Sequence, residues 1–578
     1  REMLSRLDFP NRETSLREVH FPPEGTSFTQ LQGFSTPAHR RLIFEELFYL
    51  ELGLELKRRR MKERQGIAFS TSDKVREAIR EVLPFHPTAA QKRALGEIVS
   101  DMREPAPMRR LLHGDVGSGK TIVALQAMIV AMENGYQAAL MAPTEILATQ
   151  HYLAARKLLE RSSRKPRIVL LTGSLDEDRK RSNRGLINRG DAQLVIGTHA
   201  LIEEKVEFDR LGLVVVDEQH RFGVMQRFKL MKKPNQPEPD VLVMTATPIP
   251  RTLALSLYGD LDLSVLDELP PGRTPIVTRR VEDERSEEVW DFVRKQVAQK
   301  RQAYVVYPVI EGARDDQPEL DFSHDPDGEK TPNLGTPGPS HLGTGESATK
   351  RHRKGKTPEL FPNTKQEANP NTKSGLKSAV EMYEKLRSGP LSGLRVGLIH
   401  GRLDADEKEV MMRRFQRGEV DVLVSTTVIE VGVDVPNATV MVVEHAERFG
   451  LAQLHQLRGR VGRGAAKSYC ILMTGSRVSP LAEERLNAMV RTQDGFELAE
   501  LDLSMRGPGE FFGTRQAGLP EFRVANIVRD RQILELAKLE AARFALDPGP
   551  NVTPDERARI RARLKEAWQR RYGLVEAG

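Results

Sequence analysis

The chain has 578 residues, of which 39% are hydrophobic and 29% are charged. This length predicts about three to five domains, and the composition excludes a wholly disordered, collagen-like or disulfide-scaffold chain. Lysine and arginine outnumber aspartate and glutamate by 88 to 81, a net charge of +7 that permits a polyanionic partner without requiring one.

Residues 1–84 are predicted to form a linker and one long helix. Residues 1–36 are mixed and rich in Pro and Gly, whereas over 38–64 apolar residues recur at helical spacing with charges on the opposite face. The basic end of this helix, residues 57–64, could contact nucleic acid, but such a charge run is more often a solvated helix end.

Two α/β lobes are expected next, over residues 85–270 and 271–475. Short apolar runs alternate with helical segments, which is typical of parallel sheets buried on both faces. Strands of the first lobe are expected at 111–112, 138–141, 168–171, 194–196, 211–216 and 241–244. Strands of the second lobe are expected at 303–309, 395–399, 420–424, 439–443 and 468–473. The fold class is therefore α/β, with two doubly wound parallel sheets in tandem.

The second lobe is interrupted by residues 311–375, which are rich in Pro and Gly and contain no Val, Ile, Met, Tyr or Trp. Such a segment buries too little apolar surface to offset its ordering entropy, so we expect a disordered insertion. Residues 476–578 are predicted to be a helical module with one Gly-rich charged stretch. Its last two helices are expected at 528–546 and 554–571.

Cysteine use and hydropathy predict the compartment. The single cysteine, Cys470, cannot form an intrachain disulfide or build a thiolate metal site, which favours a reducing environment. The chain contains no apolar run of about 18 residues, and residues 1–10 lack the apolar region of a secretory signal. We therefore expect a cytoplasmic protein that does not bind membranes.

A phosphate-binding loop is predicted where GDVGSGKT follows a short apolar strand and precedes a helix. Its glycines let successive backbone N–H groups wrap a phosphate, Lys120 supplies a charge to the β- and γ-phosphates, and Thr121 offers a hydroxyl to Mg²⁺. The residues expected to bind nucleotide here are Gly114, Asp115, Val116, Gly117, Ser118, Gly119, Lys120 and Thr121.

Two adjacent carboxylates end a predicted buried strand in the sequence LVVVDEQH. In a doubly wound sheet, ligands bind at this edge. Asp217 is expected to hold Mg²⁺, and Glu218 to orient and deprotonate the attacking water. A pair of acids that merely caps a strand is the alternative, and the phosphate-binding loop upstream argues against it.

Further motifs resemble those of superfamily 2 helicases, from Phe85 through nearly all the rest of the chain. They read APTE at 142–145, GTH at 197–199, TAT at 245–247, STTVIEVGVD at 425–434 and QLRGRVGR at 456–463. The resemblance implies two RecA-like lobes, adenine recognition by Gln91, and nucleotide contacts from Gly432 and Asp434. It also implies nucleic-acid contacts or coupling roles for Thr144, Thr198, Thr245, Thr247 and Thr426.

The arginines of the sequence at 456–463 have a physical interpretation of their own. Planar guanidinium groups at Arg460 and Arg463 can approach the γ-phosphate from the opposite lobe and stabilise the charge of its transition state. Hydrolysis would then require the cleft between the lobes to close. A solvated loop rich in Arg and Gly is the alternative.

Residues 491–518 resemble the translocation module that RecG helicases share with the transcription-repair coupling factor, and RGPGEFFGTRQ has the RecG form. The resemblance implies an ATP-dependent DNA helicase that moves on duplex DNA and remodels stalled replication forks and Holliday junctions in recombination and repair. It implies ATP and Mg²⁺ as cofactors, coupling roles for Arg506 and Gln516, a monomer, and branched or duplex DNA and a single-stranded DNA-binding protein as partners.

One departure from the RecG pattern affects substrate choice. That family carries an N-terminal wedge domain that binds the branch point, whereas residues 1–84 are interpreted here as linker and helix. We therefore expect only a weak preference for forks. A coupling-factor type of translocase and an RNA helicase stay open as alternatives, while Lys120, Asp217, Glu218, Arg460 and Arg463 argue against a non-catalytic ATP-gated clamp.

Overall fold

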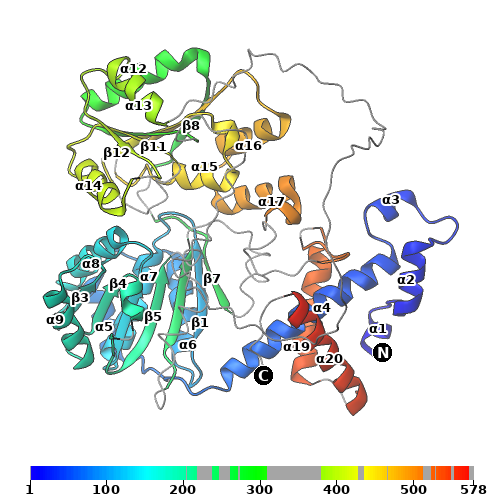
Figure 1. The fold of residues 1–578 in the computed structure, drawn as a ribbon. Coiled ribbons are helices and arrows are strands. Elements are labelled where there is room, and N and C mark those ends of the chain that lie inside the picture. Colours follow the sequence, from blue (N-terminus) through cyan, green and yellow to red (C-terminus); the bar gives the residue numbers. More distant parts are fainter. Residues whose placement is uncertain are drawn as a thin grey trace, which may run out of the picture.

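The structure is a computed structural model in which two α/β lobes stack beside a group of helices from both ends of the chain (Figure 1). It describes residues 2–203, 205–217, 237–245, 261–270, 274–308, 379–401, 403–426, 435–464, 466–511, 522–527, 529–547 and 552–571. The predicted insertion at 311–375 lies outside these ranges.

The first lobe contains a seven-stranded sheet in the order β3-β4-β2-β5-β6-β1-β7, with every neighbouring pair parallel. Its strands are β1 (Arg109–Gly114), β2 (Gln137–Met141), β3 (Ile168–Leu171), β4 (Leu194–Gly197), β5 (Leu211–Asp217), β6 (Asp240–Thr245) and β7 (Asp262–Leu266). Side chains alternate between the two faces of a strand, so Ala138 and Leu140 pack in one core and Ala139 and Met141 in the other.

Helices cover both faces of this sheet, which explains why its strands are almost wholly apolar. The first core is completed by α5 (Asp73–Val82), α6 (Ala89–Met102), α7 (Lys120–Glu133) and α8 (Glu145–Leu159). On the other face lie α9 (Glu177–Asn188) and η1 (His199–Ile202).

The second lobe contains a six-stranded parallel sheet in the order β10-β11-β9-β12-β13-β8. Its strands are β8 (Val277–Glu282), β9 (Gln302–Val306), β10 (Val396–Ile399), β11 (Val422–Ser425), β12 (Ala438–Val443) and β13 (Tyr469–Thr474). Its helices are η3 (Asp283–Arg285), α12 (Ser286–Ala298), α13 (Ala379–Ser388), α14 (Ala405–Gln416), η5 (Ala446–Arg448) and α15 (Leu451–Arg458), followed by α16 (Pro480–Arg491) and α17 (Gly495–Phe511).

The two ends of the described chain pack against each other. The long helix α4 (Pro37–Lys62) crosses α19 (Arg531–Leu546) and also contacts α2 (Arg12–His20) and α20 (Pro554–Arg571), while α1 (Glu2–Arg6) and α3 (Phe28–Gln32) complete the N-terminal part. Buried apolar side chains of α4 and α19 form their own core, which we call the helical platform. Leu503 of α17 is buried in the same core, so α17 joins the second lobe to the platform.

The predicted α/β fold class and tandem lobes are confirmed, and so is the long helix near the N-terminus. The strand predicted to reach residue 309 ends at Val306 instead, because Pro308 has no N–H to donate to a ladder. Two strands, β7 and β8, were not predicted. The basic end of α4 makes contacts within the protein. Arg59 pairs with Glu55 at 3.2 Å and donates a hydrogen bond to the Ala545 carbonyl at 2.9 Å.

No helix within the described ranges has both the length and the apolar character needed to cross a membrane.

Candidate nucleotide site between the lobes

The phosphate-binding loop connects β1 to α7 at the carboxyl edge of the first sheet. Gly117 and Gly119 have φ values of 80° and 88°, in the left-handed region that favours glycine. A Cβ at Gly119 would lie 2.3 Å from Nε2 of Gln91, so a side chain there would displace the Gln91 amide. Loop and helix together present the N-terminus of a 14-residue helix, the ordinary environment for a phosphate.

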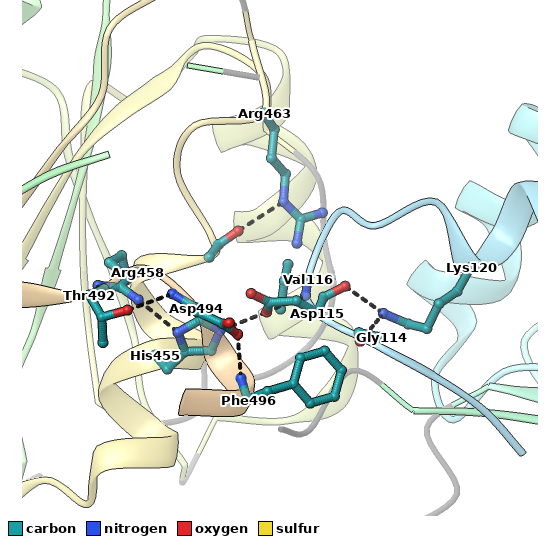
Figure 2. Close-up of polar contacts among 11 residues, drawn as sticks. Gly114, Asp115, Val116, Lys120, His455, Arg458, Arg463, Thr492, Asp494 and Phe496 are labelled. Atoms are coloured by element: carbon teal, nitrogen blue, oxygen red, sulfur yellow. Dashed lines mark hydrogen bonds and ion pairs between the residues drawn. The ribbon is translucent and has the colours of Figure 1, made fainter. Parts of the chain in front are cut away.

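Lys120 spans the mouth of this loop. Its Nζ donates hydrogen bonds to the carbonyl oxygens of Gly114 and Asp115, each at 2.8 Å (Figure 2). Because an ammonium group only donates, phosphate oxygens that carry charge are better acceptors than these two carbonyls. The predicted phosphate contact of Lys120 therefore requires only that its Nζ exchange the two carbonyl oxygens for phosphate oxygens.

Gln91 is buried and its amide faces the phosphate-binding loop. Its Oε1 accepts from the backbone N–H of Thr88 at 3.1 Å, and its Nε2 donates to the Ser118 carbonyl at 2.9 Å. The first bond belongs to a capping box that begins α6. In this arrangement Gln91 supports the loop, and the predicted adenine contact stays a prediction that requires the amide to release one of these partners.

Asp217 ends β5 at the same sheet edge as the loop. One strand, β6, separates β5 from β1, so Asp217 and the loop start about 10 Å apart by ordinary strand spacing. Thr121 lies in the first turn of α7. A carboxylate and a hydroxyl facing bound phosphates are hard oxygen ligands of the kind that Mg²⁺ prefers, so these residues fit the predicted metal. Among the described residues, no group of three or more His, Cys, Asp or Glu side chains is placed to hold a metal by itself.

The second lobe contacts the phosphate-binding loop directly. Nε2 of His455, in α15, lies 2.6 Å from Oδ1 of Asp115 (Figure 2). Nη2 of Arg458 lies 2.9 Å from the other ring nitrogen of His455. A guanidinium only donates, so Nδ1 of His455 accepts and Nε2 carries the proton that Asp115 accepts. Burial opposes ionisation of Asp115, but hydrogen bonds from His455 and from the backbone N–H of Val116, together with the positive charge of Lys120, outweigh it, and the pKa of Asp115 lies below its ordinary value.

Close packing surrounds this hydrogen bond. A Cβ at Gly459 would lie 3.1 Å from the Val116 side chain, and a Cβ at Gly495 would lie 2.7 Å from Nε2 of His455. The ring of Phe496 meets that of His113 edge to face, with centroids 4.9 Å apart. We call residues 113–116 of the first lobe, together with the residues of the second lobe that meet them, the interlobe seam. Its second-lobe members are His455, Arg458, Gly459, Gly495 and Phe496.

Arg458 ties the seam to the start of α17. It is almost fully buried, and its Nη1 donates to the carbonyl oxygens of Met489 at 2.9 Å and Thr492 at 2.8 Å. Sequence analysis singled out neither His455 nor Arg458 as a site residue. Both lie in or beside the segment 456–463, but their contacts reach residues more than 30 positions away, which no local pattern shows.

The two predicted arginine fingers lie on the turn after α15. Nε of Arg463 donates to the Gly459 carbonyl at 3.2 Å, and its guanidinium extends toward the phosphate-binding loop (Figure 2). Burial raises the pKa of Tyr304, and the charges of Arg460 and Arg463 act against that shift. The Arg463 guanidinium thus lies on the side of the loop, and the γ-phosphate contacts of Arg460 and Arg463 stay predictions.

The threonines predicted to contact nucleic acid sit where strands end. Thr144 caps the N-terminus of α8, and its hydroxyl accepts from the Leu147 N–H at 3.4 Å. Thr245 ends β6 and is buried. Thr198 and Thr426 follow β4 and β11, and both are buried with hydroxyls that have no hydrogen-bond partner among the described residues. The two hydroxyls lie at the carboxyl edges of different lobes.

Several predicted site residues cannot be placed. Arg506 falls in α17, but its side chain lies outside what the structure describes. The others outside the described ranges are Glu218, Thr247, Gly432, Asp434 and Gln516. Their predicted roles in catalysis, nucleotide binding and coupling stay predictions.

Comparison with known proteins decides the family. Three family models match, namely DEAD/DEAH box helicase at residues 88–255, the helicase conserved C-terminal domain at 360–465, and domain 3, C-terminal, of ATP-dependent DNA helicase RecG at 492–572. The ATP-dependent DNA helicase RecG of Streptococcus pneumoniae is 42% identical over 541 residues, which cover 93% of this chain and 70% of that protein. The chain belongs to the RecG family.

Other RecG proteins match over a smaller share of their own length. The RecG of Synechocystis sp. is 44% identical over 569 residues, which are 98% of this chain and 60% of that protein. A solved structure of RecG bound to a three-way DNA junction superposes with a TM-score of 0.68 at 40% identity, and the match covers 92% of this chain and 61% of the solved one. The chain thus spans about three fifths of these two RecG proteins.

Proposed function

We propose that this chain is an ATP-dependent motor that moves on duplex DNA and remodels branched DNA, such as stalled replication forks and Holliday junctions, in recombination and repair. Membership of the RecG family supports the reaction class. The observation that carries the proposal is the interlobe seam, because it sets the arginine-bearing turn of one lobe against the phosphate-binding loop of the other.

The chemistry follows from where the charges lie. Lys120 would neutralise the β- and γ-phosphates from the first lobe, while Arg460 and Arg463 would approach the γ-phosphate from the second. Thr121 and Asp217 would hold Mg²⁺, which when bound offsets the charge that develops on the phosphate oxygens. Glu218 follows Asp217 directly and is the proposed base for the attacking water. Hydrolysis would then depend on the seam being closed.

The DNA would lie across the carboxyl edges of both sheets. Thr198 and Thr426 have buried hydroxyls without partners among the described residues at those edges, one in each lobe, and each would have to become accessible before a backbone phosphate could reach it. Hydroxyl groups of this kind bond phosphate oxygens, and such contacts fix register without reading sequence. A motor whose two lobes each hold the backbone steps when the cleft between them opens and closes.

Stimulation of ATP hydrolysis by different nucleic acids tests the proposal. Rates should be measured with forked DNA, linear duplex of equal length and single-stranded RNA at two salt concentrations. We expect both DNA substrates to stimulate hydrolysis and RNA to have little effect, with stimulation falling as salt rises because phosphate contacts release counterions. Stronger stimulation by RNA would favour the RNA-helicase alternative and contradict the proposal.

Two variants separate nucleotide binding from chemistry. Lys120→Ala should weaken ATP binding because it removes the charge over the phosphates. Glu218→Gln should bind ATP with ordinary affinity and lose most hydrolysis, because the amide keeps the shape of the side chain and cannot accept the proton. Hydrolysis at the unmodified rate in Glu218→Gln would show that another group is the base.

Coupling to DNA movement is assigned to Arg506 and Gln516. Replacing either by Ala should leave DNA-stimulated hydrolysis largely present and abolish branch movement in a strand-displacement assay. Equal loss of both activities would contradict the assignment. The cytoplasmic location, the monomeric state and a single-stranded DNA-binding protein as partner stay predictions from the sequence.

A further inference from the structure

His151 contacts the carboxylate that is assigned to Mg²⁺. Its Nε2 lies 2.7 Å from Oδ2 of Asp217, although 66 residues separate them in the chain. Both side chains are largely buried, with 11% and 14% of their surface exposed. No motif pointed to this histidine, and the proposed reaction has given it no role.

The fold, and not a flexible side chain alone, brings His151 to this position. The residue lies in α8, which packs against β3 and β4 of the first sheet. Ala148 and Ala155 of the same helix are buried, and His151 lies between them at helical spacing on that inward face. Asp217 is fixed from the other side as the last residue of β5.

The contact leaves Asp217 in a defined orientation. An ionised carboxylate only accepts, so Nε2 of His151 is the donor and Oδ2 of Asp217 the acceptor. One carboxylate oxygen is then engaged, and the other is left for a ligand. Partners of this kind, which hold a metal-binding carboxylate by a hydrogen bond, set its direction and hence its affinity for the ion.

We propose that His151 is a positioning residue that holds Asp217 in the orientation needed to bind the Mg²⁺ of a bound nucleotide. The inference rests on the proposed function, because it takes nucleotide with Mg²⁺ as the ligand. It assigns no contact between His151 and the nucleotide itself. It also links the metal site to α8, the helix that Thr144 caps.

Side chains that differ in reach test this role. Gln at position 151 places an amide N–H about as far from the backbone as Nε2 of His, whereas the amide of Asn stops one methylene short. His151→Gln should therefore keep the contact with Asp217, and His151→Asn should lose it. His151→Ala removes both the donor and the ring. Arg156→Ala is the control on the same helix, because its side chain is 59% exposed and pairs with Glu160 at the surface.

Equilibrium binding of a fluorescent ADP analogue, titrated with MgCl₂ and repeated in EDTA, gives a readout other than turnover. Nucleotide affinity should rise with Mg²⁺ concentration, and the midpoint of that rise is the quantity compared. We expect this Mg²⁺ midpoint to be about 10- to 100-fold higher in His151→Asn and His151→Ala than in the unmodified chain. Their affinity in EDTA should match that of the unmodified chain. His151→Gln should need less Mg²⁺ than His151→Asn, and Arg156→Ala should match the unmodified chain.

Each other result contradicts the inference. An unchanged Mg²⁺ midpoint in His151→Asn would make the contact incidental, and a lower midpoint would mean that His151 competes with the ion. Equal losses in EDTA and in Mg²⁺, or equal effects of Gln and Asn, would indicate a packing role only. If the unmodified chain bound no nucleotide, the proposed function would fail instead, so the two failures are distinguishable.

Discussion

The interlobe seam joins its two sides mainly through polar groups, whereas the helical platform joins the two ends of the described chain through apolar ones. At the seam, a hydrogen bond of 2.6 Å between His455 and Asp115 and the buried guanidinium of Arg458 hold loop to helix. In the platform, Ile43, Leu47 and Ala537 have no exposed surface, and Phe44 packs against Phe48 with ring centroids 5.7 Å apart.

This difference teaches what each region can do. A few hydrogen bonds contribute about 1 kcal/mol each and are exchangeable with water or ligand, so a polar seam can open and close as nucleotide changes. Burial of many apolar side chains is worth far more and has no comparable substitute in water, so the platform should stay assembled. Because α17 starts at the seam and reaches the platform through Leu503, movement at the seam would be passed to a rigid body.

Truncation of a platform side chain should give the largest change in stability. Leu47→Ala removes a fully buried side chain between α4 and α19, and we expect a loss of about 2–5 kcal/mol in the free energy of unfolding of the platform. Hydrogen exchange of α4 and α19 measures it. Leu539→Ala is the matched control in α19, since that leucine is 58% exposed. Equal exchange in both variants would show that the platform is not held by its core.

A buried acid in the platform gives a pH-dependent prediction. Burial raises the pKa of Glu51 to about 7, against the opposing charges of Arg58 and Lys538 and with the help of Glu535 and Glu55. In the unfolded chain this carboxyl loses its proton near its ordinary value of 4.5, so the folded state binds more protons between about pH 4.5 and 7. Stability should therefore fall as pH rises through this window.

Glu51→Gln removes this pH dependence. Above pH 7 the variant should be more stable than the unmodified chain by about 3 kcal/mol at most, and near pH 5 the two should be similar. Urea unfolding at pH 5, 6, 7 and 8 measures how the free energy of unfolding changes with pH. A slope that persists in Glu51→Gln would assign the effect to another group.

Removal of the hydrogen bond between His455 and Asp115 should change activity and leave stability nearly unchanged. His455→Ala and Asp115→Ala should each lower kcat/KM for ATP by about tenfold, which corresponds to about 1.4 kcal/mol. Both residues act through one contact, so the double variant should be little worse than either single one. Additive losses in this double-mutant cycle would mean that the two residues act independently.

Much of the fold followed from local sequence, and the exceptions have physical reasons. Strands buried on both faces are continuous apolar runs, so β2, β4, β5 and β12 were predicted. An edge strand needs no such run: β8 reads VTRRVE and has no buried residue. The shorter β7 also lies at an edge of its sheet and alternates in burial.

The site was predictable in its motifs and not in its contacts. The phosphate-binding loop and the acid pair are contiguous, and their chemistry follows from residue types at fixed spacing. Contacts such as His455 with Asp115 join residues 340 positions apart, and those of His151 with Asp217 join residues 66 apart. Only the packing of helix on sheet and of lobe on lobe sets such distances.

The smallest expected effect belongs to the aromatic contact of the seam, and the chain offers a matched control for it. The rings of Phe496 and His113 meet edge to face with centroids 4.9 Å apart, and those of Phe292 and Tyr469 meet with the same spacing inside the second lobe. Their interplanar angles are 78° and 79°. Leucine at either Phe position keeps apolar bulk and removes the ring pair, worth about 0.5–1.5 kcal/mol.

The two substitutions should therefore differ in what they change, because one pair crosses the seam and the other does not. Phe496→Leu should lower kcat/KM for ATP by roughly two- to tenfold and leave the thermal midpoint of the second lobe in place. Phe292→Leu should lower that midpoint and leave kcat/KM unchanged. Both kcat/KM for ATP and the thermal midpoint should be measured in both variants. If Phe292→Leu lost as much kcat/KM as Phe496→Leu, hydrolysis would depend on the stability of the second lobe and not on closure of the seam.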